Sequence, residues 1–340
     1  MTNKQFIFKF FIFLFGSFLI VSSINFVVDP LYTFTFSQRF NIKKKDFNER
    51  VQKTNYLAYI DNNFDSILLG NSRATYINTL KIDKSIGGKV FNYAVNAMSV
   101  NEYAIVIQNF IHFTGKQPKV IFIAIDPFDF SNDKGENLKK ALLNSFDKVY
   151  PYKNLLSLDL FKISLQNILI TYRFNNNILD KKQRYYNKNL VKGFSKENKI
   201  SNERGILGYA NLNLHINQEV NLNLLKQLKF KYNQSQFIIF TMPVHKVILE
   251  KFLYNEGYIS WLKSLINIFY TINHYMYLND ISKSYYTFFD AFHFYPYVGD
   301  KIVENLTHLP TVFSNSDFGI ELNKDNINNF KSYSKEKEQN

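Results

Sequence analysis

The apolar residues of this chain form one long segment near the start and a series of short runs after residue 60. Residues 6–28 are apolar except for Lys9 and a few small polar side chains. A helix of about twenty residues, at about 1.5 Å each, is enough to cross the roughly 30 Å hydrocarbon core of a membrane. The cleavage pattern of a signal peptide is poor at residues 21–23, so we expect an uncleaved anchor that ends before Pro30.

Beyond the anchor, short apolar runs alternate with segments of helical periodicity. Residues 101–113, for example, place apolar side chains at the spacing of one helix face. Strands that alternate with helices predict an α/β fold, in which helices cover both faces of a parallel sheet. The predicted strands, of which the last is the weakest, are residues 67–70, 88–95, 118–125, 236–241 and 275–278.

The pattern also predicts how the chain is divided. An anchor (1–30) and a juxtamembrane linker and helix (31–60) precede a large domain (61–310), and a polar tail (311–340) follows. At 340 residues the chain is long enough for one elaborated domain with a large core. The alternation breaks down at about 132–219, where helical stripes give way to an aperiodic polar stretch. So long an interruption predicts a mainly helical insertion that forms a lid or a partner surface.

Composition narrows the range of partners. The formal net charge is +13, but the basic residues are dispersed and no nucleic-acid-binding motif occurs. We therefore expect no nucleic acid and instead an anionic membrane surface or an anionic envelope polymer. The basic cluster at 43–45 suits lipid head groups, although such a run is more often only a solvated face. The chain has no Cys, which excludes disulfides and Cys-based metal sites and leaves the redox compartment undetermined.

The stretch 65–74 has the pattern of a buried strand that enters a tight turn before a helix. A serine at the end of such a strand, here Ser72, is directed outward near the helix N-terminus, where backbone N–H groups favour developing negative charge. That position suits a nucleophile, because the anion formed on attack at a carbonyl is stabilised by groups already in place. By itself, however, a small polar residue after a strand is more often a helix cap.

A second stretch, residues 289–297, contains a histidine and an aspartate that could activate the serine. Asp290 and His293 are three residues apart, so one turn of chain can bring the carboxylate to Nδ1 of the imidazole and leave Nε2 for a hydroxyl. We therefore predict a catalytic triad in which Ser72 is the nucleophile, His293 the general base and Asp290 the residue that orients and stabilises the imidazole. His245, at the end of another predicted strand, is expected either to contact the acyl donor or acceptor or to be a helix-capping or surface histidine.

The sequence gives little support for a metal or a cofactor. The pair Asp126 and Asp129 has no clustered set of His or carboxylate residues beside it, and residues 86–89 lack the spacing and the Ser or Thr of a phosphate-binding loop. We expect no metal and no cofactor. The remaining histidines lack partners at metal-ligand spacing and are assigned no role: His112, His215, His274 and His308.

An early Gly-Asn-Ser-Arg stretch and a late Asp-x-x-His stretch follow the order of motifs in the SGNH (GDSL-like) hydrolase and acyltransferase family, which this sequence resembles over about residues 60–308. Residues 91–99 resemble the family's second block and residues 120–130 its third. The amino-acid sequences of the first and third blocks resemble those of the membrane-anchored branch, which includes DltD-like and alginate-acetylation-like proteins, more than those of secreted lipases. The resemblance implies the three-layer α/β sandwich of that family, with a parallel, flavodoxin-like sheet.

The resemblance also implies where an oxyanion would be bound. The backbone N–H groups of Ser72 and of Ala97, where family members usually carry Gly, would be donors. Asp126 stands at the position of the family's third-block Asn, and an ionised carboxylate cannot donate to an oxyanion, so it would bind Arg73 or a substrate hydroxyl instead. The neighbouring polar side chains expected to position the substrate are Asn71, Arg73 and Asn96.

The function that the resemblance implies is that of a membrane-anchored O-acyltransferase. Ser72 would take a short acyl group, expected to be acetyl, from a multi-spanning membrane acyltransferase and pass it to a hydroxyl of an envelope glycan. The anchor would hold the protein in the cytoplasmic (inner) membrane as a single-pass protein, with its main domain on the extracytoplasmic, periplasmic side. Two alternatives remain open: an exported carbohydrate esterase or deacylase that uses the same residues with water, and a non-catalytic partner of the membrane acyltransferase.

Overall fold

The computed structural model of the 340-residue chain describes residues 2–34, 48–128, 136–147, 149–174, 196–212, 219–253, 256–306 and 318–330. Several sequence predictions fall outside these ranges, namely those for the basic cluster 43–45, Asp129, His215, His308 and most of the tail 311–340. Over the described residues the chain divides into two compact units. The anchor unit comprises Met1–Asn62 with Asn137–Leu179, and the sheet unit comprises Asn63–Glu136 with Asp180–Asn340.

The first element of the anchor unit is α1 (Asn3–Val28), the long apolar helix that the sequence predicts. Its mean hydropathy reaches 2.3, and among the described residues it is the one helix long and apolar enough to cross a membrane. At about 1.5 Å per residue its 26 residues span about 39 Å, more than a hydrocarbon core of about 30 Å. α1 ends at Asp29, whose backbone is left-handed (φ 44°) and whose carboxylate accepts hydrogen bonds from the N–H groups of Thr33 and Phe34, both at 2.8 Å.

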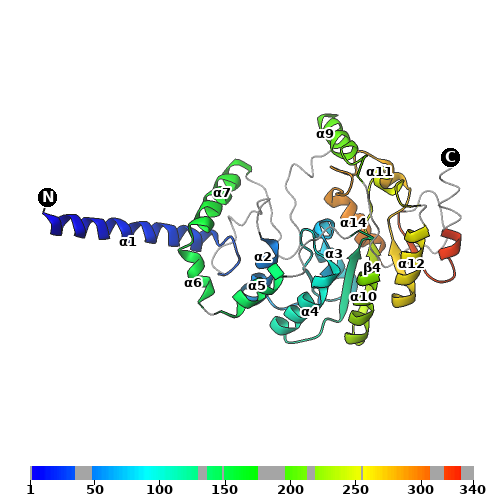
Figure 1. The fold of residues 1–340 in the computed structure, drawn as a ribbon, viewed down its shortest axis with the longest axis horizontal. Helices are drawn as coiled ribbons and strands as arrows, with labels where there is room; N and C mark the ends of the chain where they lie inside the picture. The colour runs from blue at the N-terminus through cyan, green and yellow to red at the C-terminus, as the bar shows by residue number, and fades with distance from the viewer. Residues whose placement is uncertain are drawn as a thin grey trace. The chain divides into compact units, whose positions relative to one another are not determined.

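The other helices of the anchor unit come from two separate parts of the sequence. α2 (Glu49–Asn55) continues into a π-helical turn, η1 (Tyr56–Ile60). α5 (Glu136–Phe146), α6 (Tyr150–Leu155) and α7 (Leu158–Phe174) lie in the predicted insertion and are helical, as its apolar stripes indicate. α6 and α7 pack against α1 near its C-terminal end (Figure 1).

The sheet unit confirms the predicted α/β fold with a mainly parallel sheet. Six strands of the described residues form one sheet in the order β2-β1-β3-β4-β5-β6, in which the first five are parallel and β6 is antiparallel to β5. The first five follow one of the two common orders of doubly wound sheets. The strands are β1 (Ser66–Leu69), β2 (Val90–Asn92), β3 (Val120–Ile125), β4 (Gln236–Thr241), β5 (Ile272–His274) and β6 (Ile320–Leu322).

Three strands differ from the sequence prediction. β2 covers only residues 90–92 of the predicted 88–95. The fifth strand lies at 272–274 rather than at 275–278, although the apolar residues that follow it are just as buried. The reason is a change of hydrogen-bond acceptor, because the Tyr275 N–H donates to the side-chain Oγ1 of Thr241 at 2.9 Å and not to a backbone carbonyl of β4. β6 lies within the segment predicted as a polar tail, where three residues pair with β5.

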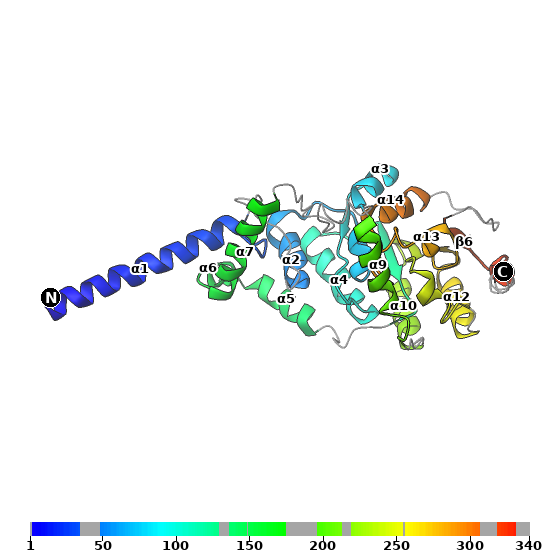
Figure 2. The same ribbon diagram turned by 90° about the horizontal axis from the view of Figure 1, so that it is seen from above.

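Right-handed crossovers place the helices of this unit on both faces of the sheet. From β1 the chain turns to one neighbour, β2, and from β2 it crosses back to β3, so the helices of these two connections lie on opposite faces. The order reverses at β1, and in sheets of this type ligands bind beyond the carboxyl ends of the strands at such a reversal. α3 (Thr79–Ile86) and α14 (Pro296–Asn305) pack together on one face, and α4 (Val100–Thr114), α10 (Glu219–Lys231) and α12 (Glu256–Phe269) on the other (Figure 2).

Candidate active site

The turn that follows β1 is packed tightly against β3. A Cβ on Gly70 would lie 2.9 Å from the Cβ of Ala124, so only glycine lets the chain turn this close to its neighbour. Asn71 then caps the 3₁₀ helix η2 (Ser72–Tyr76), because its side-chain oxygen accepts a hydrogen bond from the second N–H of that helix at 3.2 Å. Ser72 is the first residue of η2, so its own N–H is among the donors that a helix start leaves without an intrahelical acceptor.

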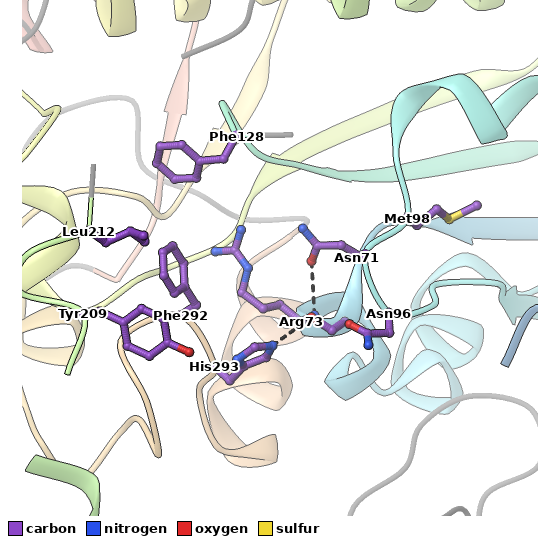
Figure 3. Close-up of a pocket in the computed structure, with 11 residues that line it drawn as sticks. Asn71, Arg73, Asn96, Met98, Phe128, Tyr209, Leu212, Phe292 and His293 are labelled. Carbon is purple, nitrogen blue, oxygen red and sulfur yellow. Dashed lines mark hydrogen bonds between the residues drawn. The ribbon is translucent and has the colours of Figure 1, made fainter. Parts of the chain in front are cut away.

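The three residues predicted as a triad lie together at this turn. Ser72 Oγ is 2.8 Å from Nε2 of His293, although the two residues are 221 positions apart in the sequence. Nδ1 of the same ring is 3.0 Å and 2.9 Å from the two carboxylate oxygens of Asp290. Figure 3 shows the His293 ring at the base of the cavity, with a dashed line marking its bond to the serine. The side chains therefore have the geometry of a hydroxyl, a base and a carboxylate in series.

The Asp290 carboxylate is held ionised by its own loop. Burial alone would raise its pKa, but hydrogen bonds from the His293 ring and from the N–H groups of His293 (2.7 Å) and Phe292 (2.8 Å) bring the pKa below its ordinary value. Tyr76 lies close by, and burial together with the Asp290 charge raises the pKa of its hydroxyl, which stays protonated. An ionised Asp290 favours the tautomer in which Nδ1 carries the proton, so that Nε2 faces Ser72 as an acceptor.

A buried ion pair braces the serine turn. Arg73 and Asp126 contact each other directly, and their side chains are only 2% and 3% exposed. Asn71 donates a side-chain hydrogen bond to the same carboxylate, and Arg73 donates another to the Met242 carbonyl at 3.3 Å. These contacts join the ends of β1, β3 and β4, so the three side chains hold the turn in place. Of the two partners that the sequence left open for Asp126, the structure places Arg73 beside it.

The loop after β2 brings Asn96 and Ala97 to the same cavity as Ser72. Ala97 has a left-handed backbone (φ 49°), which glycine adopts without strain and which costs a residue with a Cβ about 1–2 kcal/mol. The position therefore suits the glycine that the resembling family usually carries, and alanine is the smallest side chain that departs from it.

The cavity has a volume of about 310 Å³ and two unlike sides. One side carries the triad serine and histidine with their polar neighbours, and the other, here named the apolar wall, is formed by Phe128, Tyr209, Leu212 and Phe292. Figure 3 shows the apolar wall opposite Asn96. Its rings meet edge to face, with centroids 5.3 Å apart for Tyr209 and Phe292 and 6.3 Å apart for Phe128 and Phe292. None of these four residues is among the site residues predicted from the sequence.

Two residues of the apolar wall come from the predicted insertion. α9 (Lys196–Leu207) leads into a turn that carries Tyr209 and Leu212 to the cavity. Lys251 fixes this turn, because its ammonium group donates to the carbonyls of Ala210 at 2.6 Å and Leu212 at 2.7 Å. The insertion thus contributes two of the four residues of the apolar wall, which is a placement expected of a lid.

His245 is not among the described residues that line the cavity. Its side chain is fully buried, and its ring packs against Tyr285 at a centroid distance of 4.8 Å. Nδ1 caps α11 (Lys246–Leu249) by accepting a hydrogen bond from the Val247 N–H at 3.4 Å, which is the capping role that the sequence left open. Burial, and then the neighbouring lysine, lower the pKa of His245 to about 4.

In the described part of the chain, no three His, Asp or Glu side chains gather where they could hold a metal ion. The groups at hand for chemistry are the hydroxyl, imidazole and carboxylate of the triad, together with backbone N–H groups. No model of a known protein family matches the chain, and no curated protein matches it. The relation to the family named from its motifs therefore stays a prediction.

Proposed function

We propose that this protein is a membrane-anchored serine O-acyltransferase of the SGNH type, which works through an acyl-enzyme on Ser72. One observation carries the proposal: Ser72 Oγ lies 2.8 Å from His293 Nε2, and the other ring nitrogen lies 2.9 Å from the Asp290 carboxylate. A hydroxyl, an imidazole and an ionised carboxylate in this order activate serine for acyl transfer on several unrelated folds. The position of Ser72 beyond a strand of a doubly wound sheet also supports the proposal.

In the first half-reaction, Nε2 of His293 takes the proton of the Ser72 hydroxyl while Oγ attacks the carbonyl carbon of the donor ester. The new Oγ–C bond forms as the carbonyl electron pair moves onto oxygen. Collapse of this tetrahedral intermediate breaks the bond to the leaving alcohol, which receives the proton from His293. Asp290 remains ionised throughout and stabilises the transient imidazolium.

The oxyanion of that intermediate needs donors that are already in place. The Ser72 N–H at the start of η2 is one, and the N–H of Ala97 is the second donor in this proposal. In the second half-reaction His293 removes the proton of an acceptor hydroxyl, which attacks the acyl carbon and releases Ser72. The acyl group thus moves from one oxygen to another without any change in oxidation state.

The acyl group in this proposal is short, acetyl in the simplest case, and the acceptor is a hydroxyl of an envelope glycan. A cavity of about 310 Å³ is at the lower end of the size range for drug-sized ligands, so it holds an acetyl group with part of the acceptor. The apolar wall favours transfer over hydrolysis, because it limits the access of water to the acyl-enzyme. In this proposal α1 anchors the protein in the cytoplasmic membrane, the sheet unit lies on the extracytoplasmic side, and a multi-spanning acyltransferase supplies the donor there. The length and hydropathy of α1 support the anchoring part of the proposal.

Intact-mass analysis of the full chain in detergent micelles, after reaction with a fluorophosphonate probe, tests the proposal. The wild type gains one probe adduct, whereas Ser72→Ala gains none and His293→Ala reacts at least about a hundredfold more slowly. Ser85→Ala is the matched control, because its hydroxyl only donates to the Ile82 carbonyl within α3, and it labels like the wild type. A folded wild type that takes up no probe contradicts the proposal and supports the non-catalytic partner.

A second experiment separates transfer from hydrolysis. p-Nitrophenyl acetate forms an acetyl-enzyme whose decay is followed with and without an oligosaccharide acceptor. Transfer predicts slow release of acetate in water and an acetylated oligosaccharide when the acceptor is present. Rapid release of acetate that the acceptor does not divert would replace the transferase by the carbohydrate esterase.

A further inference from the structure

The outer face of α7 carries large apolar side chains. Leu158, Leu165 and Leu169 are 71%, 39% and 67% exposed. Their separations of seven and four residues place them on one face of the helix. Ser164 and Asn167 of the same helix are buried, and Leu160 packs against the buried Leu31 and Val51. The inward face of α7 is therefore mixed, and the three exposed leucines are an apolar stripe that the unit itself does not cover.

α6 and its flanking residues repeat this arrangement. Val149, Tyr152 and Leu156 are 54%, 65% and 54% exposed, at separations of three and four residues. The apolar residues 149, 152, 156, 158, 165 and 169 together are named the elbow face. Lysines interrupt both stripes, with Lys153 exposed by 64% on α6 and Lys162 exposed on α7. Apolar stripes with interspersed lysine and tyrosine characterise helices in the membrane interface, where lysine stems lie along apolar chains and the ammonium reaches the phosphates.

Asn25 of α1 fixes the elbow between α6 and α7. Its side-chain nitrogen donates to the carbonyls of Asn154 (3.3 Å), Leu155 (2.9 Å) and Ser157 (3.0 Å), and its oxygen accepts from the Ser164 hydroxyl at 3.0 Å. Asn25 is 2% exposed. The Asn154 and Ser157 carbonyls also accept backbone N–H groups, so Asn25 adds a second donor to these two and holds the elbow at the last turn of α1.

The position of the elbow along α1 determines its depth in a membrane. α1 exceeds a hydrocarbon core of about 30 Å by about 9 Å, so its last turn lies at the level of the head groups. Residues 6–20 of α1 bear the exposed apolar side chains that a hydrocarbon core would cover. α6 and α7 lie at the C-terminal end of α1 and run across its axis rather than along it (Figures 1 and 2). They are therefore oriented as helices that lie in the plane of a membrane surface.

We propose that the elbow face is a membrane-binding surface, inserted into the head-group and upper acyl region of the leaflet from which α1 emerges. The partner is an anionic phospholipid bilayer, because the surface is continuous with a membrane-crossing helix and carries lysine beside its apolar residues. The inference rests on α1 crossing the bilayer and not on the chemistry at Ser72. A protein partner on the same face is the competing occupant, and the experiment below distinguishes the two.

The chain contains no cysteine, so single cysteines introduced at the elbow face report their depth without interference. Leu158→Cys, Leu169→Cys and Tyr152→Cys, each at an exposed position, are labelled with bimane in the full chain. The protein is reconstituted in vesicles of phosphatidylcholine and phosphatidylglycerol. Quenching by a nitroxide near the glycerol end of the lipid is compared with quenching by aqueous iodide. Phe13→Cys on α1 is the control for the bilayer interior, and Phe230→Cys on α10, 83% exposed, is the control for water.

The proposal expects the three elbow labels to be quenched severalfold more by the lipid nitroxide than the Phe230→Cys label, and to be shielded from iodide. Quenching by iodide to the extent seen at Phe230→Cys would overturn the proposal. Shielding from both quenchers would overturn it as well, because it would mean that protein, not lipid, covers the elbow face.

Discussion

At the scale of single residues, the contact between Arg73 and Asp126 is the most consequential charge arrangement of the sheet unit. Both side chains are almost fully buried, and the ends of β1, β3 and β4 are tied through them. Two charges in such a place stabilise the fold only as long as they face each other, because each was desolvated on folding. The buried guanidinium of Arg73 in the Gly-Asn-Ser-Arg stretch therefore needs the Asp126 carboxylate as its counter-charge.

Asp126→Asn keeps the size of the side chain and removes the charge that faces Arg73. We expect the variant to lose about 3–5 kcal/mol of unfolding free energy, because the guanidinium stays buried without a counter-charge. Denaturant unfolding of the full chain in micelles measures the loss. Asp147→Asn, which breaks an exposed pair with Lys153, is the matched control and changes little. An equally small change for Asp126→Asn would show that the buried pair is not needed.

His274 makes the stability of the protein depend on pH. Its ring is fully buried with Nδ1 3.0 Å from Thr241 Oγ1, and burial lowers its pKa from 6.5 to about 3. Between these two pH values the unfolded chain binds a proton at His274 that the folded chain does not. The stability that His274 contributes in its neutral form is therefore fully present above about pH 6.5 and is lost as the pH falls toward 3.

We expect His274→Phe to flatten this loss of stability, because phenylalanine fits among the same aromatic neighbours and takes up no proton. Unfolding free energies measured between pH 7 and pH 4 check the expectation, with each unit of pKa shift worth about 1.4 kcal/mol. His245, with a pKa of about 4, contributes in the same direction, so the slope decreases without vanishing. Parallel curves for the variant and the wild type would contradict the assignment.

At the scale of elements, the turn after α9 determines the shape of the cavity. Lys251 on the other side of the turn holds two of its carbonyls, at 2.6 Å and 2.7 Å. Lys251→Met keeps the length of the side chain and removes both hydrogen bonds, so we expect the apolar wall to loosen at Tyr209 and Leu212.

The expected result of Lys251→Met is a change in selectivity, in which the ratio of labelling rates for a bulky and a small fluorophosphonate rises. Unfolding free energy should fall by about 1.5–3 kcal/mol, as for other hydrogen bonds to a charged group. Lys263→Met, at an exposed position of α12, is the control and leaves both quantities unchanged. An unaltered ratio in Lys251→Met would mean that the turn keeps its shape without the lysine.

The elements show how far sequence reasoning reaches. β4 lies at 236–241 as predicted, because an apolar run between polar segments has no other interpretation there. The fifth strand was misplaced because Tyr275 is as apolar as a strand residue, and only the tertiary bond to Thr241 Oγ1 ends the pairing before it. β6 is only three residues long and lies in a polar segment, so no local sequence pattern predicts a strand there.

The residues of the candidate site likewise divide into those that local sequence patterns predict and those that only the fold brings to the cavity. Asp290 and His293 are three residues apart, a distance that one turn of chain can close, and Ser72 follows directly after a predicted strand. These local patterns were sufficient to name the three residues as candidates. Tyr209 and Leu212 come from a segment without periodicity and reach the cavity through the fold alone. Phe128 and Phe292 stand within two residues of Asp126 and His293, and this proximity is the only signal that sequence offered for the apolar wall.

At the scale of the whole molecule, the anchor unit is built from two stretches that the first three strands separate in the sequence. No local pattern in the sequence pairs α1 with α7, because their contact is a tertiary one that includes the buried hydrogen bond from the Ser164 hydroxyl to the Asn25 side chain. α1 is therefore a structural part of its unit as well as an apolar helix long enough to cross a membrane.

Removal of residues 1–33 tests this second role of α1. The truncation removes the hydrogen bonds that Asn25 makes to three carbonyls and to the Ser164 hydroxyl, and the Asn154 and Ser157 carbonyls keep only their backbone donors. We therefore expect α6 and α7 to become sensitive to proteases. Fluorophosphonate labelling of Ser72 should persist, because the triad lies within the sheet unit. Asn25→Ala in the full chain should show a smaller effect of the same kind. Equal protease resistance in the truncated and full chains would contradict this role.

The long separation of the triad in the sequence has a consequence for biosynthesis. His293 follows Ser72 by 221 residues, so the serine emerges from the ribosome, and crosses the membrane in the proposed topology, well before its base. In the meantime β3 has one unpaired edge, since its partner β4 begins only at residue 236. A nascent chain therefore carries an inert hydroxyl next to an aggregation-prone strand, and Ser72 gains its base only after residue 293 has been made.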